Sequence, residues 1–439
     1  MPATRSRVKW LVRHGIIRGV LHYAAWRGEV IARLSADERA RKNPYRIYAW
    51  CREQGPVWQG RLAKVAPHHA SVSAILRSDA FKVGLDVEAV PRLMRGALMR
   101  SDGRIIGPID PPSLLALNPP DHTRYRKLVA KVFTPRAIAA LEPRVQAVAD
   151  ELLDDLETRA AAGETVDIAV EYAGLLPVTV IAEILGVPAS ARDDFLRWGH
   201  AAAPSLDIGL SYRDWVACEQ GIYDFNEWMY AHIERLRRDP GEDLLSQLIA
   251  VEDDQGRLTD LELVATAGLL MAAGFETTVN LLGSGTKVLL ENPDQLAVLR
   301  EDPTLWANAV DELLRYESPV QQTARLAAVD TEIAGVKIAK GTFVNVMIAA
   351  ANRDGGVFED PERFDVARPN ARDHLAFSAG VHYCIGASLA RTEGRIGLQT
   401  LFDRFPDLEL AGEPVLRPTR TLRGYDHLPV VLTPRKLAA

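Results

Sequence analysis

The sequence predicts a mainly α-helical protein with a smaller β portion, and three observations favour this class. Helical periodicity of the apolar residues dominates, with ten segments between residues 44 and 404. Alternating patterns are confined to three short regions, and no Gly/Ser-rich or Pro-rich linker divides the chain. We therefore expect a single domain over residues 41–439, preceded by a helical extension over residues 1–40.

The expected elements follow these two periods in chain order. The helical pattern covers 44–54, 119–134, 137–158, 166–185, 190–202, 214–238, 242–250, 260–291, 305–317 and 385–404. Alternating segments cover 58–66, 323–347 and 416–433, and within 331–347 Gly335 and Gly341 predict the turns of a hairpin.

Residues 8–31 predict a basic amphipathic helix, in which apolar side chains such as Trp10 and Leu21 are interspersed with Arg13 and Arg18. We expect this helix to dock on the body of the protein, and weak peripheral membrane contact is the alternative. The two arginines interrupt what would be the apolar part of a signal peptide. No segment is predicted to be a transmembrane span.

The composition is that of a globular protein that acts on neither DNA nor RNA. Hydrophobic residues make up 47% and charged residues 25% of the chain, and the formal net charge is −6. A mildly acidic chain is not a general nucleic-acid binder. Three cysteines cannot form a disulfide framework, which favours a reducing, cytoplasmic location.

Residues 260–291 predict one unusually long helix, which begins at a capping box between Thr259 and Glu262. At about 1.5 Å per residue it would be about 50 Å long, enough to cross a whole domain. Small residues around Gly274, followed by an acid and two hydroxyls, interrupt its apolar centre. Close packing against another helix explains Gly274 as well as a functional role does.

The strongest functional signal is a glycine-bearing loop that leads into Cys384 and then directly into a helical pattern. At a helix N-terminus, the positive end of the helix and free backbone N–H groups favour a thiolate. Gly380 can adopt a conformation that other residues avoid, and Gly386 leaves room for a flat group. This context argues against a merely buried, inert cysteine.

The loop resembles the haem-binding loop of the cytochrome P450 family, with the pattern Phe-x-x-Gly-x-His-x-Cys-x-Gly. Its fixed residues are Phe377, Gly380, His382, Cys384 and Gly386. The resemblance implies the fold of that family, a triangular prism with haem b between the long central helix and the Cys-bearing helix. It also implies that the Cys384 thiolate is the axial ligand of the haem iron. Ser378 stands where many members have glycine, and we expect it to alter the loop only slightly.

Other motifs extend the resemblance from about residue 44 to residue 433. Glu312 and Arg315 are similar to the Glu-x-x-Arg signature of the family, and Arg368 is similar to the arginine that joins this pair. By resemblance, these three residues form a buried structural ion network beneath the haem. We expect them to support the fold and haem retention rather than the reaction.

The resemblance also assigns residues around the haem. The implied propionate partners are His122, Arg126, Arg325 and His382. Arginine suits this role because its planar fork matches a carboxylate. Glu276 and Thr277 resemble the acid–alcohol pair that relays protons to dioxygen, and Ala273 and Gly274 are expected to line the haem and O2 site.

The implied function is a haem-thiolate monooxygenase that inserts one oxygen atom of O2 into an apolar small molecule. No flavin, nucleotide or iron–sulfur motif is recognisable, so we expect electrons from ferredoxin and an NAD(P)H-dependent ferredoxin reductase. A basic patch for that partner is expected at Arg124, Lys127, Lys131 and Arg391. Two alternatives stay open: a peroxide-driven or coupling enzyme, and a non-catalytic haem-thiolate sensor or ligand carrier.

The substrate pocket is expected to be apolar, but the sequence leaves the ligand open among lipids, steroids, terpenes and aromatics. By family position, the pocket draws on 84–117, 200–210, Leu269, Leu270, Ala273, 320–324 and Tyr425. Within the first of these segments, the apolar candidates are Leu98, Met99, Leu114 and Leu115.

Overall fold

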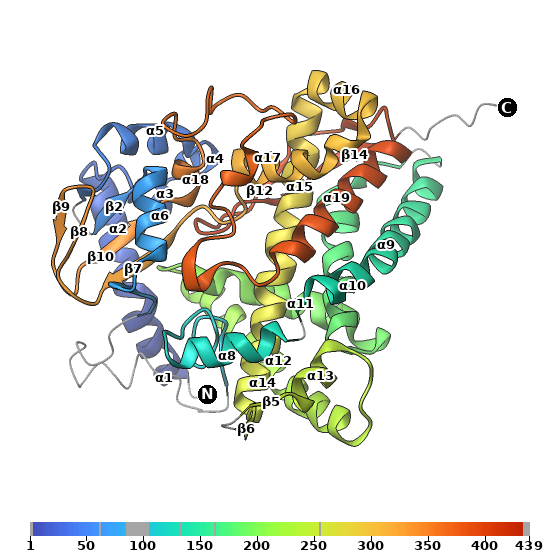
Figure 1. The fold of residues 1–439 in the computed structure, drawn as a ribbon, viewed down its shortest axis with the longest axis horizontal. Helices are drawn as coiled ribbons and strands as arrows, with labels where there is room; N and C mark the ends of the chain where they lie inside the picture. The colour runs from blue at the N-terminus through green and yellow to red at the C-terminus, as the bar shows by residue number, and fades with distance from the viewer. Residues whose placement is uncertain are drawn as a thin grey trace.

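The structure is a computed structural model that describes residues 3–60, 63–84, 105–131, 133–161, 164–253 and 256–432. Helices dominate, and a smaller sheet region lies at one side of the molecule, at the left of Figure 1. The predicted fold class, mainly α with a smaller β portion, is therefore confirmed.

The helices occupy most of the described chain. The α-helices are α1 Ala3–Trp10, α2 Ile16–Trp26, α3 Arg33–Ala36, α4 Glu38–Lys42, α5 Tyr45–Glu53, α6 His69–Arg77, α8 Asp121–Ala130, α9 Pro135–Ala161, α10 Leu175–Ile184, α11 Arg192–Ala202, α12 Tyr212–Arg238, α13 Leu244–Ala250, α14 Asp260–Leu269, α15 Glu276–Glu291, α16 Pro293–Glu301, α17 Trp306–Tyr316, α18 Ile348–Ala351 and α19 Ala387–Arg404. Among the described residues, three π-helical turns lie next to α-helices, at Leu11–Gly15, Ala169–Ala173 and Leu270–Phe275.

The strands are short. They are β1 Trp58–Gln59, β2 Lys64–Ala66, β3 Phe81–Lys82, β4 Val166–Asp167, β5 Glu252–Asp253, β6 Gly256–Arg257, β7 Thr323–Ala327, β8 Thr331–Ile333, β9 Val336–Ile338, β10 Phe343–Val346, β11 Glu409–Leu410, β12 Val415–Leu416, β13 Tyr425–His427 and β14 Pro429–Val431. The main sheet has the order β1-β2-β10-β7-β3, in which β10 is parallel to β2 and antiparallel to β7. The predicted hairpin is confirmed only for β8 and β9, because β10 joins the main sheet instead.

The long central helix is confirmed over Asp260–Glu291, as α14, a π-helical turn and α15 in succession. The predicted capping box between Thr259 and Glu262 is present at its start. It crosses the molecule beside α19 (Figure 1). Glycine permits this close approach, because a Cβ at Gly285 would lie only 2.9 Å from Leu398 of α19, closer than real side chains pack.

The same helix is the one element of the described residues that is long and apolar enough to cross a membrane. Two-thirds of its apolar stretch, 67%, is buried inside the protein, as in the core helix of a globular protein. The largest hydrophobic cluster includes Val279 and Leu282 of this helix, together with Leu398 and Leu401 of α19. The helix is therefore a core element that positions one side of the candidate site.

Two sequence predictions of helices were wrong in part. Residues 166–185 are not one helix: β4 pairs with β14, a π-helical turn follows, and α10 begins only at Leu175. The pairing partner of β4 lies far along the chain, so local periodicity could not reveal it. The N-terminal helix ends at Trp26 rather than at residue 31, because Gly28 takes a positive φ of 83° and stops it.

Candidate active site

The cysteine loop, residues 377–386, contains a short 3₁₀ turn, Gly380–His382, and ends at the start of α19. The backbone N–H of Cys384 donates to the carbonyl of Phe377 at 2.9 Å, which closes the loop. Gly380 has a φ of 67°, and a Cβ there would lie 2.4 Å from the carbonyl oxygen of Leu76. The glycine is therefore required both by its conformation and by the close approach of α6.

Ser378 is strained in this loop. Its φ is 62°, in the left-handed region that favours glycine, and its buried Oγ has no hydrogen-bond partner among the described residues. This conformation explains why a glycine is the residue that suits this position.

Cys384 lies just before α19, and its environment is less favourable to a free thiolate than the helix terminus alone predicted. Part of the residue is accessible to water, yet many protein atoms surround the thiol, and this burial raises its pKa. A hydrogen bond from Gly386 N–H and the charges of Arg126 and Arg391 oppose the rise without cancelling it. A positively charged metal at the sulfur would supply what these groups do not.

Four basic side chains from three separate elements gather beside this thiol. His122 and Arg126 come from α8, Arg325 from β7 and His382 from the cysteine loop. The rings of His122 and His382 lie 4.3 Å apart, centroid to centroid. Burial, together with the charges of Arg325 and Arg126 and with His122, lowers the pKa of His382 to about 3.

These basic groups face each other without an acidic partner in the described chain. Burial lowers the pKa of Arg325 to about 10, and its Nη1 bonds only to Thr323 Oγ1 and the Ala324 carbonyl, at 3.1 and 2.9 Å. A buried guanidinium without a counter-charge is costly. A flat group that carries two carboxylates and a metal that a thiolate can bind would fit this donor set, and haem is such a group.

The centre of the long helix carries a stripe of partly exposed residues. Leu269, Ala273 and Thr277 are four residues apart and retain accessible surface, whereas most of their neighbours are buried. The helix is π-helical over Leu270–Phe275, and the Thr277 hydroxyl donates to the Ala273 carbonyl at 2.6 Å. A Cβ at Gly274 would lie 3.4 Å from Ile181, so packing alone does not demand glycine there.

Glu276 is turned into the protein and has its own partners. Its side chain is 1% exposed, and Oε1 bonds to Nη1 of Arg417, which follows β12. His200 Nδ1 lies 3.7 Å from Oε2, which has no hydrogen-bond partner in the described structure. Burial and the Arg417 charge lower the pKa of His200 to about 4, so this imidazole is neutral near pH 7. The structure contains no hydrogen bond between Glu276 and Thr277.

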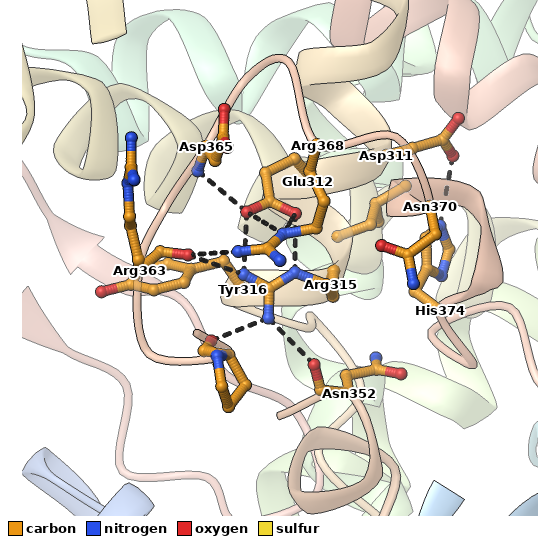
Figure 2. Close-up of polar contacts among 12 residues, drawn as sticks. Asp311, Glu312, Arg315, Tyr316, Asn352, Arg363, Asp365, Arg368, Asn370 and His374 are labelled. Carbon is orange, nitrogen blue, oxygen red and sulfur yellow. Dashed lines mark hydrogen bonds and ion pairs between the residues drawn. The ribbon is translucent and has the colours of Figure 1, made fainter. Parts of the chain in front are cut away.

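Figure 2 shows the network of Glu312, Arg315 and Arg368. Glu312 and Arg315 are completely buried, and their two contacts are 2.6 and 2.8 Å long. Arg368 Nε lies 3.1 Å from both carboxylate oxygens of Glu312. The remaining guanidinium N–H groups donate to backbone carbonyls, including those of Asn352 and Arg363. The ion network therefore ties α17 to residues 352–368, the segment before the cysteine loop, which we call the meander.

Asp311, which the sequence analysis missed, links this meander to the cysteine helix. Its buried carboxylate accepts from Arg391 Nε at 2.7 Å and contacts His374 Nε2 at 3.2 Å. Burial opposes ionisation, but the hydrogen bonds and charges of His374 and Arg391 together outweigh it and lower the pKa of Asp311. The guanidinium of Arg391 also lies over the Phe377 ring, 4.6 Å from its centroid. The only sequence signal was that Asp311 directly precedes Glu312.

The expected basic patch is partly neutralised. Arg391 is held by Asp311, and Arg124 Nη1 lies 3.6 Å from Glu262 Oε1. Lys127 is exposed, and Lys131 donates to the backbone carbonyl of Glu252. The two lysines are thus the more accessible charges of the set.

The residues expected to line the substrate pocket differ in their exposure to solvent. Leu98 and Met99 lie outside the described residues. Leu270 and Tyr425 are buried. Gln321 is also buried and accepts a hydrogen bond from the Tyr48 hydroxyl at 2.8 Å, so its side chain is used in internal packing. Among the expected lining residues, Leu269, Ala273, Ala324 and Leu115 retain accessible surface.

Comparison with known proteins gives a consistent result. Residues 206–422 match the family model described as Cytochrome P450. The chain is 47% identical over 435 residues to the putative cytochrome P450 140 of Mycobacterium tuberculosis, covering 98% of this chain and 99% of the relative. It is 41% identical over 403 residues to the vitamin D(3) 25-hydroxylase of Pseudonocardia autotrophica, covering 90% and 95%.

A solved structure gives the same fold. P450BioI in complex with an acyl carrier protein ligated to hexadec-9Z-enoic acid superposes with a TM-score of 0.83 and 33% identity, covering 91% of this chain and 100% of that chain. The mycobacterial relative matches nearly the whole chain, so most of residues 1–40 has a counterpart there.

Proposed function

This chain belongs to the cytochrome P450 family and is a haem-dependent monooxygenase, and from that premise we propose that it hydroxylates a lipid-sized apolar molecule. Enzymes of this family use haem b and O2, and haem, when bound, supplies the chemistry that activates dioxygen. The protein has to hold the cofactor, position the substrate and deliver protons.

The observation that carries the proposal is the convergence of basic side chains on Cys384. We assign Cys384 as the axial thiolate, and His122, Arg126, Arg325 and His382 as the propionate partners. The absence of a carboxylate partner for Arg325 in the described chain supports this assignment. Phe377, Gly380 and Gly386 shape the loop that presents the sulfur. Glu312, Arg315 and Arg368 act at a distance, by fixing the meander that carries this loop.

Proton delivery is assigned first to Thr277. Its Oγ1 lies on the accessible stripe of the central helix and is held by the Ala273 carbonyl. Glu276 is buried and bonded to Arg417, so it can pass a proton to Thr277 only after that bond breaks. Ala273 and Gly274 complete the wall of the O2 site on this helix.

The apolar, accessible side chains of Leu269, Ala273 and Ala324 support an apolar substrate. A relative of this chain is named vitamin D(3) 25-hydroxylase, and we use that molecule as the first candidate of the right size. The acyl chain named with the P450BioI structure is the second candidate.

Electrons are proposed to come from a ferredoxin and its NAD(P)H-dependent reductase, which dock near Lys127 and Lys131. A cytoplasmic location is proposed because no disulfide joins the three cysteines, all of which lie in the described residues. We further propose that residues 41–439 form the haem domain and that residues 1–40 are an addition to it.

Reconstituted turnover tests the proposal. We expect oxygenated product from the holoenzyme with NADPH, ferredoxin and reductase, and a shift of the haem spectrum when vitamin D(3) or hexadec-9-enoic acid is added. Product formation with hydrogen peroxide alone, and none with the reductase system, would instead identify a peroxide-driven enzyme. If both candidates gave no product and no spectral shift, that result would contradict the proposed substrate class.

A further inference from the structure

We propose that the outer face of the N-terminal helix, residues 8–26, binds the surface of a lipid bilayer that contains anionic lipids. The proposal rests on the helix itself and does not depend on the substrate or the redox partner.

The inner face of this helix is fixed on the body of the protein. Trp10 Nε1 donates to the Leu210 carbonyl at 3.0 Å, and Arg18 Nη1 donates to the Gly209 carbonyl at 3.0 Å. The Trp10 ring also meets the Tyr212 ring edge-on at 5.6 Å. These contacts set the rotation of the helix, and therefore determine which side chains face outward.

The outward side carries a row of large apolar residues, which we call the outer stripe. It consists of Val8, Leu11, Ile16, Val20, Tyr23 and Trp26, each between 45% and 77% exposed. Isolated exposed apolar residues are ordinary, but a continuous row along one helix marks an interaction surface.

The π-helical turn at Leu11–Gly15 makes the stripe continuous. Residues five apart are roughly aligned in a π-helix, whereas in an α-helix they point well away from each other. Leu11 is the first residue of this turn and Ile16 directly follows it, so the two are five apart, and the other members are three or four apart. A helical wheel drawn with a single period of 3.6 residues therefore hides the stripe.

The positive charge of the N-terminal segment indicates an anionic partner. Residues 1–28 contain six Lys and Arg and no Asp or Glu, in a chain whose formal net charge is −6. The segment is thus +6 and the remainder of the chain −12. A basic helix with a long apolar face is typical of peptides that lie in the plane of an anionic membrane.

The end of the stripe is also suited to a bilayer interface. Tyr23 and Trp26 lie side by side, with ring centroids 5.8 Å apart, and both are strongly exposed. Tyrosine and tryptophan favour the headgroup region, since each has an apolar body and a polar tip.

A second copy of the chain fits this surface less well. An isologous contact through the outer stripe would bring two +6 segments together, and their repulsion would oppose association. An anionic bilayer gives the same apolar burial with attraction in place of repulsion.

Co-sedimentation of the full-length holoprotein with vesicles tests the proposal. We expect binding to vesicles of phosphatidylcholine mixed with phosphatidylglycerol, weaker binding at high salt, and little binding to phosphatidylcholine alone. The variant Val8→Ser/Ile16→Ser/Val20→Ser should bind at least about tenfold more weakly. The matched control Val329→Ser/Val415→Ser/Val431→Ser alters residues that are 48% to 53% exposed elsewhere and should bind as the wild type does.

Gly19 permits a second test that leaves the packing unchanged. It is exposed within α2, and a Cβ there would meet nothing within 4 Å. Gly19→Glu should weaken binding to anionic vesicles, and Gly19→Lys should strengthen it.

Several outcomes would overturn the proposal. These are no vesicle binding by the wild type, equal binding to neutral and anionic vesicles, or indistinguishable binding by Gly19→Glu and Gly19→Lys. A wild-type dimer that becomes monomeric in the Val8→Ser/Ile16→Ser/Val20→Ser variant, without vesicle binding by either, would assign the stripe to self-association instead. Binding of duplex DNA in place of vesicles would assign it to nucleic acid.

Discussion

The carboxylate of Glu276 on the central helix is bonded to the guanidinium of Arg417 in the C-terminal β region, whereas the adjacent Thr277 donates its hydroxyl to the Ala273 carbonyl. Glu276 is 1% and Arg417 10% exposed, so both charges are withdrawn from water. The acid of the proposed proton relay is therefore engaged in a buried ion pair, which must break before Glu276 can exchange a proton with Thr277.

Arg417→Gln should destabilise the protein by about 3–5 kcal/mol, because it leaves the Glu276 carboxylate buried without its partner. The double variant Glu276→Gln/Arg417→Gln should recover part of that loss. Chemical denaturation measures both effects. Breaking the exposed pair of Glu38 and Lys42 is the control and should cost less than about 1 kcal/mol. Equal losses at the two pairs would contradict a buried ion pair.

Thr277→Ala should raise the yield of hydrogen peroxide relative to product, because it removes the hydroxyl that holds a proton on the accessible stripe. Peroxide and product are measured together during reductase-supported turnover. Thr286→Ala is the matched control on the same helix. The Thr286 hydroxyl is buried and donates to the Leu282 carbonyl at 2.8 Å. Unchanged coupling in Thr277→Ala would remove Thr277 from the proposed relay.

Ser378→Gly should stabilise the protein by about 1–2 kcal/mol. It relieves the positive φ of 62° and removes a buried hydroxyl that lacks a partner in the described structure. Thermal unfolding measures this effect, and the midpoint of Ser378→Gly should lie above that of the wild type. Ser378→Ala keeps the unfavourable φ and separates the two causes. A lower midpoint for Ser378→Gly would mean that the hydroxyl has a partner that outweighs the backbone strain.

Glu393 on α19 predicts a pH-dependent stability. Burial raises its pKa from 4.5 to about 8, with Thr278 opposing the shift. The folded state therefore keeps a proton that the unfolded chain loses above about pH 4.5, and stability falls as pH rises from there towards pH 8. Glu393→Gln abolishes this dependence, so its advantage over the wild type should grow across that range, to at most about 5 kcal/mol.

Denaturation at several pH values measures this difference. The exposed Glu301 provides the control, since Glu301→Gln removes a surface charge and should change the stability by less than about 0.5 kcal/mol. A pH-independent difference for Glu393→Gln would mean that Glu393 is ionised in the folded protein.

The sequence predicted the parts of the site that depend on local pattern. The helical period located α12, α17 and α19, and the motif around Cys384 located the loop, because these features involve neighbouring residues. The partners of buried charges could not be predicted in this way. Arg417 reaches Glu276 only because the C-terminal strands fold back on the central helix, and Asp311 meets Arg391 across two helices. Single-sequence periodicity contains no information on such contacts.

The π-helical turns escaped prediction for a related reason. Leu11–Gly15 and Leu270–Phe275 each insert a wider turn into an α-helical pattern, and a search at one fixed period reads through it. The turn at Leu11–Gly15 changes which side chains share the face that we propose to bind a membrane, and the turn at Leu270–Phe275 lies within the accessible stripe of the central helix.

The measurement that tests the central claim most directly is the carbon-monoxide difference spectrum of the reduced protein and of its Cys384→Ala variant. We predict the long-wavelength Soret band of thiolate-ligated haem in the wild type, and its loss in Cys384→Ala. The control Cys51→Ala/Cys218→Ala alters only the two buried cysteines and should keep the band. A thiolate band that survives in Cys384→Ala, or a wild type that binds no haem, would contradict the assignment of Cys384 as the haem ligand.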